Sequence, residues 1–477
     1  MGWKDVLLLC KNTLKVALIK SISGFRGTIG GKTGDNLSPK DIVELTYGYA
    51  VWLKSKSTNK KTTIVIGRDG RISGDMVSRL VTGTLLACGV DVKDAGLSTT
   101  PSIEMLVPHL KADGGIILTA SHNPMEWNAL KLLNNKGEFI SAADGAELLN
   151  TIENSEFSFA EIQDLGKSEV LVGGGIEYHI EEILKDKLVD VEAIKKANFK
   201  VVFDGINSTG SIAIPKLLKA LGVTDFEGIN TEIGGVFAHN PEPLKKHLTD
   251  ICDKVKEKKA DIGIVVDPDV DRLAFIDETG EMYGEEYTLI TVADYMFKTQ
   301  RGAVVSNLSS SRALADLAAK NGNDYYAAAV GEVNVVEKMK EVSAILGGEG
   351  NGGIIYPPLH YGRDALVGIA LVLTYMAKEK KSLSQLKESY SQYFMIKDKI
   401  QLDATIDVDA ILQRISSAFA NEKVDKTDGV KVDFANGWVH LRKSNTEPII
   451  RVYAEAPTEK EAITLVDSIK EEVFSKK

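Results

Sequence analysis

The chain has 477 residues, a net charge of -10, 44% hydrophobic residues and 26% charged residues. This length and composition predict roughly three or four domains of ordinary globular type. The acidic charge argues against nucleic acid or an anionic membrane as the main partner, so an anionic ligand would need a local cluster of donor groups. Cys10, Cys88 and Cys252 lie far apart without metal-ligand spacing, which favours a reducing compartment over a disulfide framework.

The segment 1–19 is interpreted as an N-terminal extension. Its apolar core, Val6 to Cys10, is shorter than the hydrophobic region of a signal peptide, and no small-residue cleavage site follows it. No stretch of the chain holds enough consecutive apolar residues for a membrane span. We therefore expect a cytoplasmic protein that binds neither membranes nor nucleic acid.

A strand-like run, a loop rich in Gly, Ser or Asp, and an amphipathic helix recur three times in this order. The three helices are predicted near residues 76–88, 212–221 and 314–320. This order of elements predicts βαβ units, and therefore three successive α/β domains of similar type with mixed or mostly parallel sheets. We place these domains at residues 20–158, 159–278 and 279–385.

The C-terminal region, residues 386–477, follows a different pattern. Two of its strand-like runs are joined by Asn436 and Gly437, which predict a tight hairpin turn. Thr458 and Glu461 form a capping-box pattern that opens the last helix. One face of this helix carries Ala462, Leu465, Ile469 and Val473. These features predict a small α+β domain with its helices on one side of an antiparallel sheet.

An acidic turn follows an apolar strand in the segment 261–275. Asp267, Asp269 and Asp271 occupy alternate positions, so their carboxylates can converge on one point, where their repulsion is costly unless a cation is bound. All-oxygen ligation without a nearby His or Cys favours Mg²⁺ over Ca²⁺. The alternative interpretation is a solvated acidic turn.

A serine follows another apolar strand in the segment 114–124. Ser121 lies at the carboxyl end of this strand, where α/β domains usually bind ligands. Its hydroxyl is a poor nucleophile by itself and needs a metal or a base. His122 is adjacent, but neighbouring side chains on an extended loop usually diverge, which favours a loop-organising or phosphate-contacting role over that of a base. A plain loop serine is the alternative.

Two further loops carry polar groups of other kinds. The segment 440–456 concentrates hydrogen-bond donors that suit a phosphate dianion, namely Arg442, Lys443, Ser444, Asn445, Thr446 and Arg451. In the segment 345–357, glycines bracket Glu349 and Asn351, a pair suited to vicinal sugar hydroxyls. The alternatives are a basic surface hairpin and a flexible glycine loop.

Taken together and in this order, the four loops resemble the α-D-phosphohexomutase superfamily, which includes phosphoglucomutase, phosphomannomutase and phosphoglucosamine mutase. The resemblance runs from about Ile22 to the C-terminus. The motifs that carry it are TASHNP (119–124), DPDVDR (267–272), GEGNGG (348–353) and RKSNTEP (442–448). Supporting matches are SGFRG (23–27), GRDGR (67–71) and WNALK (127–131).

The resemblance implies four domains around a central cleft, with one loop from each. It implies that Ser121 carries a phosphoryl group, and that Asp267, Asp269 and Asp271 hold one Mg²⁺ beside it, with the serine phosphate as a further ligand. The substrate would be a small sugar phosphate that passes through a 1,6-bisphosphate, which also serves as activator. Glu349 and Asn351 would grip the sugar ring. The non-reacting phosphate would be held by Arg442, Ser444, Asn445, Thr446 and Arg451.

By family position, Arg26 and Lys131 line the reacting end. A guanidinium stays protonated, so we expect Arg26 to orient the phosphoryl group and stabilise charge. Lys131 can titrate if it is desolvated, so it is the preferred proton-transfer candidate.

The sugar loop departs from the common bacterial pattern, in which many relatives carry Ser at the position of Asn351 and His at that of Gly353. This departure resembles the phosphoglucosamine mutase branch and favours glucosamine phosphate over glucose and mannose phosphates. A phosphatase, in which water attacks the phosphoserine, and a non-catalytic sugar-phosphate sensor are the rival functions. A homodimer is compatible with these motifs, which do not define the oligomeric state.

Overall fold

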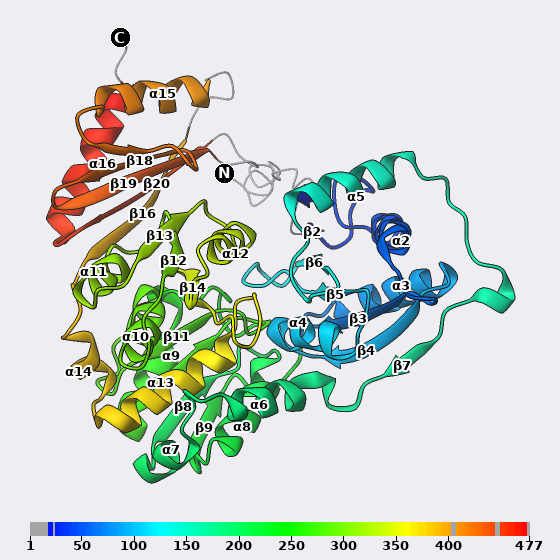
Figure 1. Ribbon diagram of the computed structural model, residues 1–477, viewed down its shortest axis with the longest axis horizontal. Coiled ribbons are helices and arrows are strands. Elements are labelled where there is room, and N and C mark those ends of the chain that lie inside the picture. Colours follow the sequence, from blue (N-terminus) through cyan, green and yellow to red (C-terminus); the bar gives the residue numbers. More distant parts are fainter. Residues whose placement is uncertain (1–17, 22–23, 402–406, 444–448, 475–477) are drawn as a thin grey trace, which may run out of the picture.

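The computed structural model describes residues 18–21, 24–401, 407–443 and 449–474 (Figure 1). Most of the predicted N-terminal extension lies outside these residues. The chain forms four domains, which we number I (19–170), II (176–276), III (285–387) and IV (394–474). Figure 1 shows domain I, in blue to cyan, at one end of the molecule and domain IV, in orange to red, at the other.

Domain I contains a seven-stranded mixed sheet with the strand order β1-β2-β6-β5-β3-β4-β7. Its strands are β1 (Ile19–Ser21), β2 (Gly24–Thr28), β3 (Thr63–Arg68), β4 (Asp91–Leu97), β5 (Gly114–Leu118), β6 (Trp127–Leu133) and β7 (Ser168–Val170). Its helices are α2 (Pro39–Lys56), α3 (Gly74–Ala87), α4 (Thr100–His109) and α5 (Ala142–Asn154). Short 3₁₀ turns follow at Ile162–Asp164 and Val172–Gly175.

Both faces of this sheet are buried because successive strand residues point to opposite sides. In β3, Ile64 and Ile66 pack with residues of α2, α3 and α5, whereas Val65 packs with residues of α4 on the other side. Strand β7 pairs in parallel with β4, so it belongs to the first sheet, although the sequence division placed it in the second domain. All three residues of β7 are exposed, which explains why no apolar pattern marks this edge strand.

Domain II has a four-stranded sheet with the order β11-β10-β8-β9. Its strands are β8 (Lys200–Asp204), β9 (Asp225–Ile229), β10 (Ile262–Val266) and β11 (Leu273–Ile276). Its helices are α6 (Ile176–Lys185), α7 (Val191–Ala197), α8 (Gly210–Ala220) and α9 (Thr249–Lys258), with a 3₁₀ turn at Lys245–His247.

Domain III has a sheet of the same size with the order β13-β12-β14-β15. Its strands are β12 (Val304–Asn307), β13 (Tyr325–Ala328), β14 (Leu346–Glu349) and β15 (Gly353–Ile355). Its helices are α10 (Glu285–Phe297), α11 (Ala313–Lys320), α12 (Glu332–Glu341), α13 (Ala365–Glu379) and α14 (Leu383–Lys387). Helix α13 is buried along most of its length, as expected for a helix that is apolar all round, and one continuous core spans domains II and III.

The predicted architectural repeat is confirmed, because the first three sheets share a four-stranded unit. In each unit the first strand lies between the second and the third, parallel to both, and the fourth strand joins the third antiparallel. The connection from the third to the fourth strand spans residues 119–126 in domain I, 267–272 in domain II and 350–352 in domain III. The three predicted chemical loops of domains I to III therefore occupy the same position in each repeat.

Domain IV has the predicted antiparallel sheet, with the order β16-β20-β19-β18-β17. Its strands are β16 (Phe394–Gln401), β17 (Lys423–Asp425), β18 (Val430–Phe434), β19 (Gly437–Lys443) and β20 (Ile449–Ala456). Helices α15 (Val408–Ala418) and α16 (Glu459–Phe474) pack on one side of it. Thr458 and Glu461 form the predicted cap.

The hairpin between β18 and β19 differs from the prediction in its register. Gly437 is already paired with Phe434, so the two-residue turn is Ala435 and Asn436. A Cβ at position 437 would lie 2.3 Å from the carbonyl oxygen of Glu455, so the glycine permits close strand packing and does not form the turn.

The last helix also differs in part from its predicted apolar face. On α16, Leu465 is only partly buried, while its neighbour Val466 is in the core. Among the described residues, no helix is long and apolar enough to cross a lipid bilayer.

Candidate active site

All four domains line one cleft, which encloses about 570 Å³. The predicted site residues on its wall are Arg26, Ser121, His122, Lys131, Glu349 and Arg442. Five other charged residues on the wall were given no role from the sequence, namely Arg272, Glu332, Glu337, Arg363 and Asp428. The fold therefore brings the candidate nucleophile, one residue of the sugar loop and one phosphate-binding arginine to the same space.

Ser121 is held in a strained conformation at the end of β5. Its φ of 50° is in the left-handed region, which residues other than glycine adopt at a cost. The side chain is buried, and its Oγ donates a hydrogen bond to Asp267 Oδ2 at 2.6 Å. The Ser121 N–H donates to Thr119 Oγ1 at 2.9 Å. The backbone thus directs the hydroxyl across the domain boundary toward the acidic loop of domain II.

Arg71, within the GRDGR match, fixes the shape of this serine loop. Its guanidinium is fully buried and donates from Nε to Asp69 Oδ2 at 2.9 Å. The other guanidinium nitrogens donate to the main-chain carbonyl oxygens of Ser121, Asn123, Pro124 and Trp127. One side chain therefore satisfies four carbonyl groups, which explains why the loop can keep a strained serine.

The three aspartates of domain II converge as predicted. Their side chains are fully buried, and one carboxylate oxygen from each lies within 4.8 Å of the others. Asp267 Oδ1 accepts hydrogen bonds from the N–H groups of Asp271 and Arg272, both at 3.1 Å. Val270 adopts a φ of 63°, a costly conformation for a β-branched residue that allows the turn to place Asp269 and Asp271 beside Asp267.

This acidic cluster fits a hard divalent cation. Burial, and next the carboxylates of Asp271 and Asp269, raise the pKa of Asp267 well above its ordinary value. Asp269 Oδ1 and Asp271 Oδ1 are buried, and neither has a hydrogen-bond partner among the described residues. Orphaned carboxylate oxygens are costly in a protein interior. A bound cation would satisfy both oxygens and offset the repulsion among the three charges.

Lys131 lies against the same cluster. Its Nζ donates to Asp269 Oδ2 at 2.8 Å and to Asp271 Oδ2 at 3.1 Å, and Thr100 Oγ1 also donates to Asp269 Oδ2, at 2.6 Å. Burial lowers the pKa of the ammonium, but the two carboxylates outweigh burial and raise it. Desolvation was expected to lower the pKa of Lys131, but the neighbouring carboxylates raise it instead, and the side chain is a cation. Its role in proton transfer stays a prediction.

His122 and Arg26 lie on the cleft side of the serine loop. His122 Nδ1 is 3.4 Å from Ser121 Oγ. Burial, together with the positive charges of Arg272 and Arg26, lowers the pKa of His122 well below its ordinary value, so the imidazole is neutral. Arg26 Nη1 donates to Asn123 Oδ1 at 2.9 Å, which fixes its guanidinium beside the loop.

In the sugar loop, Glu349 is the better placed of the two predicted residues. Its Oε1 accepts from Asn307 Nδ2 at 2.9 Å and from the Gly331 N–H at 3.2 Å, and its Oε2 accepts from Arg363 Nη1 at 2.8 Å. Asn351 is half-buried, lies 3.5 Å from Glu349 Oε2 through its Nδ2, and is not among the residues that line the cleft. In this structure the side chain of Asn351 is therefore not placed to contact a sugar in the cleft.

On the phosphate side, Arg442 is held by Asp428. The Nε of Arg442 is 2.7 Å from Asp428 Oδ2, and the same oxygen accepts the N–H of Val330 in domain III at 2.9 Å. Arg451 lies opposite Arg442 on the neighbouring strand, with an exposed side chain. Of the other predicted donors, Lys443 is exposed and paired with Asp409 at 2.9 Å, and Ser444, Asn445 and Thr446 lie outside the described residues.

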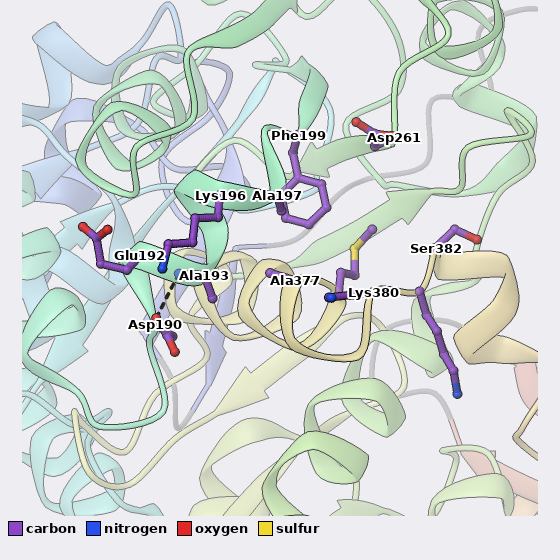
Figure 2. A pocket seen from close by; sticks show the side chains of 12 residues that line it. Asp190, Glu192, Ala193, Lys196, Ala197, Phe199, Asp261, Ala377, Lys380 and Ser382 are labelled. Carbon is purple, nitrogen blue, oxygen red and sulfur yellow. Dashed lines mark hydrogen bonds between the residues drawn. The ribbon is translucent and has the colours of Figure 1, made fainter.

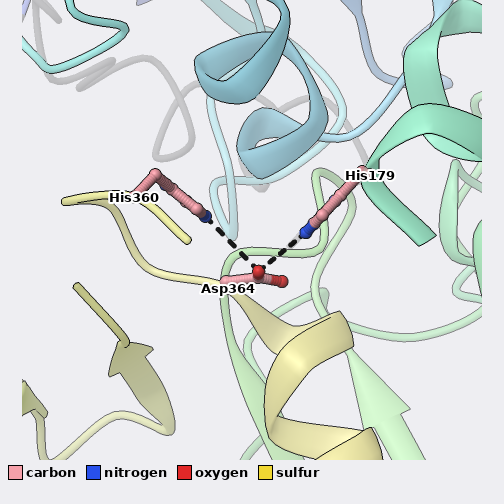
Figure 3. A group of neighbouring side chains, drawn as sticks. All are labelled: His179, His360 and Asp364. Carbon is pink, nitrogen blue, oxygen red and sulfur yellow. Dashed lines mark hydrogen bonds and ion pairs between the residues drawn. The ribbon is translucent and has the colours of Figure 1, made fainter. Parts of the chain in front are cut away.

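A second buried cluster connects three domains (Figure 3). Asp364 Oδ2 is 2.8 Å from His179 Nε2 and 3.3 Å from His360 Nε2. His179 Nδ1 pairs with Ser102 Oγ at 3.1 Å, and His360 Nδ1 lies 3.1 Å from Glu104 Oε2. Both histidines point at one carboxylate, which already caps helix α13 through its other oxygen. The cluster therefore links α4 of domain I, α6 of domain II and α13 of domain III.

Another cavity, of about 580 Å³, lies between α7 and the C-terminal part of α13 (Figure 2). Its wall mixes acidic and basic side chains with Phe199 and Ala377, and includes Asp261 just before β10. The metal loop follows the opposite, carboxyl end of β10. Because α/β sheets bind ligands at the carboxyl ends of their strands, this cavity is separate from the chemical site.

Comparisons with known proteins identify the family of the chain. Four models of phosphoglucomutase/phosphomannomutase match the chain in order: the alpha/beta/alpha domains I, II and III at residues 18–159, 177–280 and 284–393, and the C-terminal domain at residues 399–472. A phosphoglucomutase/phosphomannomutase of Thermococcus kodakarensis is 35% identical, with 91% of this chain and 95% of the relative covered.

A phosphoglucosamine/phosphogalactosamine mutase of Sulfurisphaera tokodaii is 32% identical, with 94% of this chain and 99% of the relative covered. A solved phosphoglucomutase/phosphomannomutase family protein from Burkholderia thailandensis has the same fold, with a TM-score of 0.82, 23% identity and 96% of both chains covered. This chain therefore belongs to the phosphoglucomutase/phosphomannomutase family of the α-D-phosphohexomutase superfamily and is an isomerase.

Proposed function

We propose that the protein interconverts glucosamine 1-phosphate and glucosamine 6-phosphate, with Ser121 as the phosphoryl carrier and a 1,6-bisphosphate as intermediate and activator. The observation that carries this proposal is the position of Ser121. Its strained backbone directs Oγ to Asp267 at 2.6 Å, in a cleft to which all four domains contribute. A plain loop serine would gain nothing from the cost of this conformation.

The cation that fits the site is Mg²⁺, held by Asp267, Asp269 and Asp271. The all-oxygen ligand set and the two orphaned carboxylate oxygens support this choice. When bound, the ion neutralises negative charge on the transferring phosphoryl group.

In the first half-reaction a sugar hydroxyl oxygen forms a bond to phosphorus while the bond from phosphorus to Ser121 Oγ breaks. Oγ keeps the electron pair of that bond, and over the step one proton moves from the sugar hydroxyl to Oγ. Lys131 lines the same cleft and is our proposed carrier of this proton: as a cation it gives a proton to Oγ and takes one back from the sugar hydroxyl. Arg26 and the neutral His122 orient the phosphoryl group. The reverse transfer, after the sugar has turned over, restores the phosphoserine.

The choice of glucosamine phosphate rests on the sugar loop and on a relative. Asn351 and Gly353 follow the pattern of the phosphoglucosamine mutase branch, and the relative from Sulfurisphaera tokodaii is named a phosphoglucosamine/phosphogalactosamine mutase. Glu349 faces the cleft and can accept a sugar hydroxyl in either orientation of the ring. Glucose and mannose phosphates are the competing substrates.

Phosphorus NMR tests both the reaction and the substrate. Purified protein is incubated with Mg²⁺ and glucosamine, glucose or mannose 1-phosphate in parallel, each primed with its 1,6-bisphosphate. We expect 6-phosphate to form fastest from glucosamine 1-phosphate and not to form with Ser121→Ala. Faster conversion of another sugar would change the substrate. Release of free phosphate without isomerisation would indicate a phosphatase, and no turnover of any sugar would favour a sensor.

A further inference from the structure

Arg363 lies where the metal loop meets the sugar loop. Its Nη2 donates to Asp271 Oδ2 and its Nη1 donates to Glu349 Oε2, both at 2.8 Å. Its Nε is 3.1 Å from Glu332 Oε2. The side chain is only 9% exposed and lines the cleft. One guanidinium therefore touches carboxylates of both loops and of helix α12.

The surroundings of Arg363 hold it in this position. The main-chain N–H of Arg363 donates to Glu332 Oε1 at 2.8 Å, and the next residue, Asp364, caps helix α13. A Cβ at Gly353 would lie 2.3 Å from Arg363 Cδ, so the arginine fills the space that a side chain at position 353 would need. Arg363 can therefore extend to both loops only because position 353 carries a glycine, the residue at which this loop departs from the common bacterial pattern.

This contact set suits an arginine and no other cation. A planar guanidinium presents several N–H donors at fixed angles, whereas a lysine ammonium is a single point charge on a flexible stem. The two Nη contacts fix the separation of Asp271 from Glu349. They also place a positive charge beside a carboxylate that would hold a metal.

We propose that Arg363 is a positioning residue that couples the sugar loop to the metal loop by holding Glu349 and Asp271 on one guanidinium. This inference rests on the proposed function for the roles of the two loops. The coupling has a cost, because a fixed cation beside Asp271 weakens the attraction of the site for a divalent ion. Arg363 therefore trades metal affinity for the alignment of sugar and phosphoryl group.

Removal of Arg363 should separate these two effects. In Arg363→Ala we expect Mn²⁺, used as a probe in the absence of sugar, to bind about tenfold more tightly, because a unit positive charge near the site is lost. Turnover should fall about a hundredfold, mainly in kcat, because the misalignment of reacting groups by about 1 Å costs this much. Loss of structure alone would weaken metal binding and turnover together. Mn²⁺ affinity is measured by electron paramagnetic resonance and kcat by the NMR assay.

Two further variants keep the test decisive if Arg363→Ala does not fold. Gly353→Ala leaves the charge but displaces the side chain, so we expect reduced kcat with a smaller change in Mn²⁺ affinity. Arg363→Lys keeps one charge but not both contacts, so kcat should not be restored. Arg79→Ala removes an exposed arginine that forms a surface ion pair with Asp75; it is the matched control and should leave both quantities unchanged.

The coupling is wrong if Arg363→Ala or Gly353→Ala keeps the kcat of the wild type, or if Arg363→Ala binds Mn²⁺ no more tightly than the wild type. Failure of the proposed function would look different. In that case the wild type would convert no sugar phosphate, while the Mn²⁺ measurement would still report the charge effect of Arg363.

Discussion

The buried network of Figure 3 should make the stability of the protein fall at alkaline pH, and His360→Gln should remove part of this fall. Burial lowers the pKa of His360, but hydrogen bonds and charges from Asp364 and Glu104 outweigh it and raise the pKa to about 10. The ordinary value in an unfolded chain is about 6.5. Because the folded-state pKa is raised, the stabilisation is fully present below pH 6.5 and is lost as the pH rises through 10.

The magnitude follows from proton linkage. Between pH 7 and pH 9 the folded protein holds one proton on His360 that the unfolded chain has mostly released. The free energy of unfolding then falls by about 1.4 kcal/mol per pH unit, or about 2.5 kcal/mol over this window. Domains II and III share one core, and for an unfolding unit as large as both together the midpoint of thermal unfolding should fall by about 5–10 °C from this source.

Scanning calorimetry of the wild type and His360→Gln at pH 7, 8 and 9 measures the effect. The variant should be less stable at pH 7, because Glu104 and Asp364 lose their cationic partner, but its transition should depend less on pH. His247→Gln, outside the network, is the control and should keep the slope of the wild type. Equal slopes in the wild type and His360→Gln would refute the assignment of a bound proton to His360.

Three further outcomes follow from the site. In Arg71→Lys, the lysine cannot donate to all four carbonyl groups of the serine loop. We expect kcat to fall by about a hundredfold with little change in Mn²⁺ affinity. An unchanged kcat would show that the loop is held by other contacts. Asp269→Asn removes one metal ligand and its charge, so the Mg²⁺ concentration for half-maximal activity should rise by at least about tenfold, and the same Mg²⁺ requirement as in the wild type would exclude Asp269 as a ligand. Asp428→Asn weakens the hold on Arg442, so KM for the sugar phosphate should rise several-fold with kcat nearly constant, and a change confined to kcat would contradict a role in phosphate binding.

The local patterns of the sequence were sufficient for the architecture and for the loops that carry chemistry. Buried strands such as β3, β5 and β10 are short apolar runs, and each βαβ unit has its own local signature, so the repeat could be predicted. The equivalent positions of the three chemical loops were seen only in the structure. The converging aspartates were predictable because alternate positions in one turn lie close together whatever the rest of the fold does. The hairpin residues were less predictable, because a glycine serves turns and close strand packing equally well, and at Gly437 it serves the packing.

Only the tertiary structure decided which charged groups, distant in the sequence, contact one another. The sequence gives no sign that Arg363 would reach Asp271, 92 residues away, or that Arg71 would hold the loop of Ser121, 50 residues away. The direction of the pKa shift of Lys131 has the same origin, because burial alone lowers it and the carboxylates of another domain raise it. Electrostatic effects depend on separations in space of a few ångströms and on burial, neither of which is encoded locally. The sequence by itself therefore determined the parts of the site, and the packing of the domains determined their charges and their coupling.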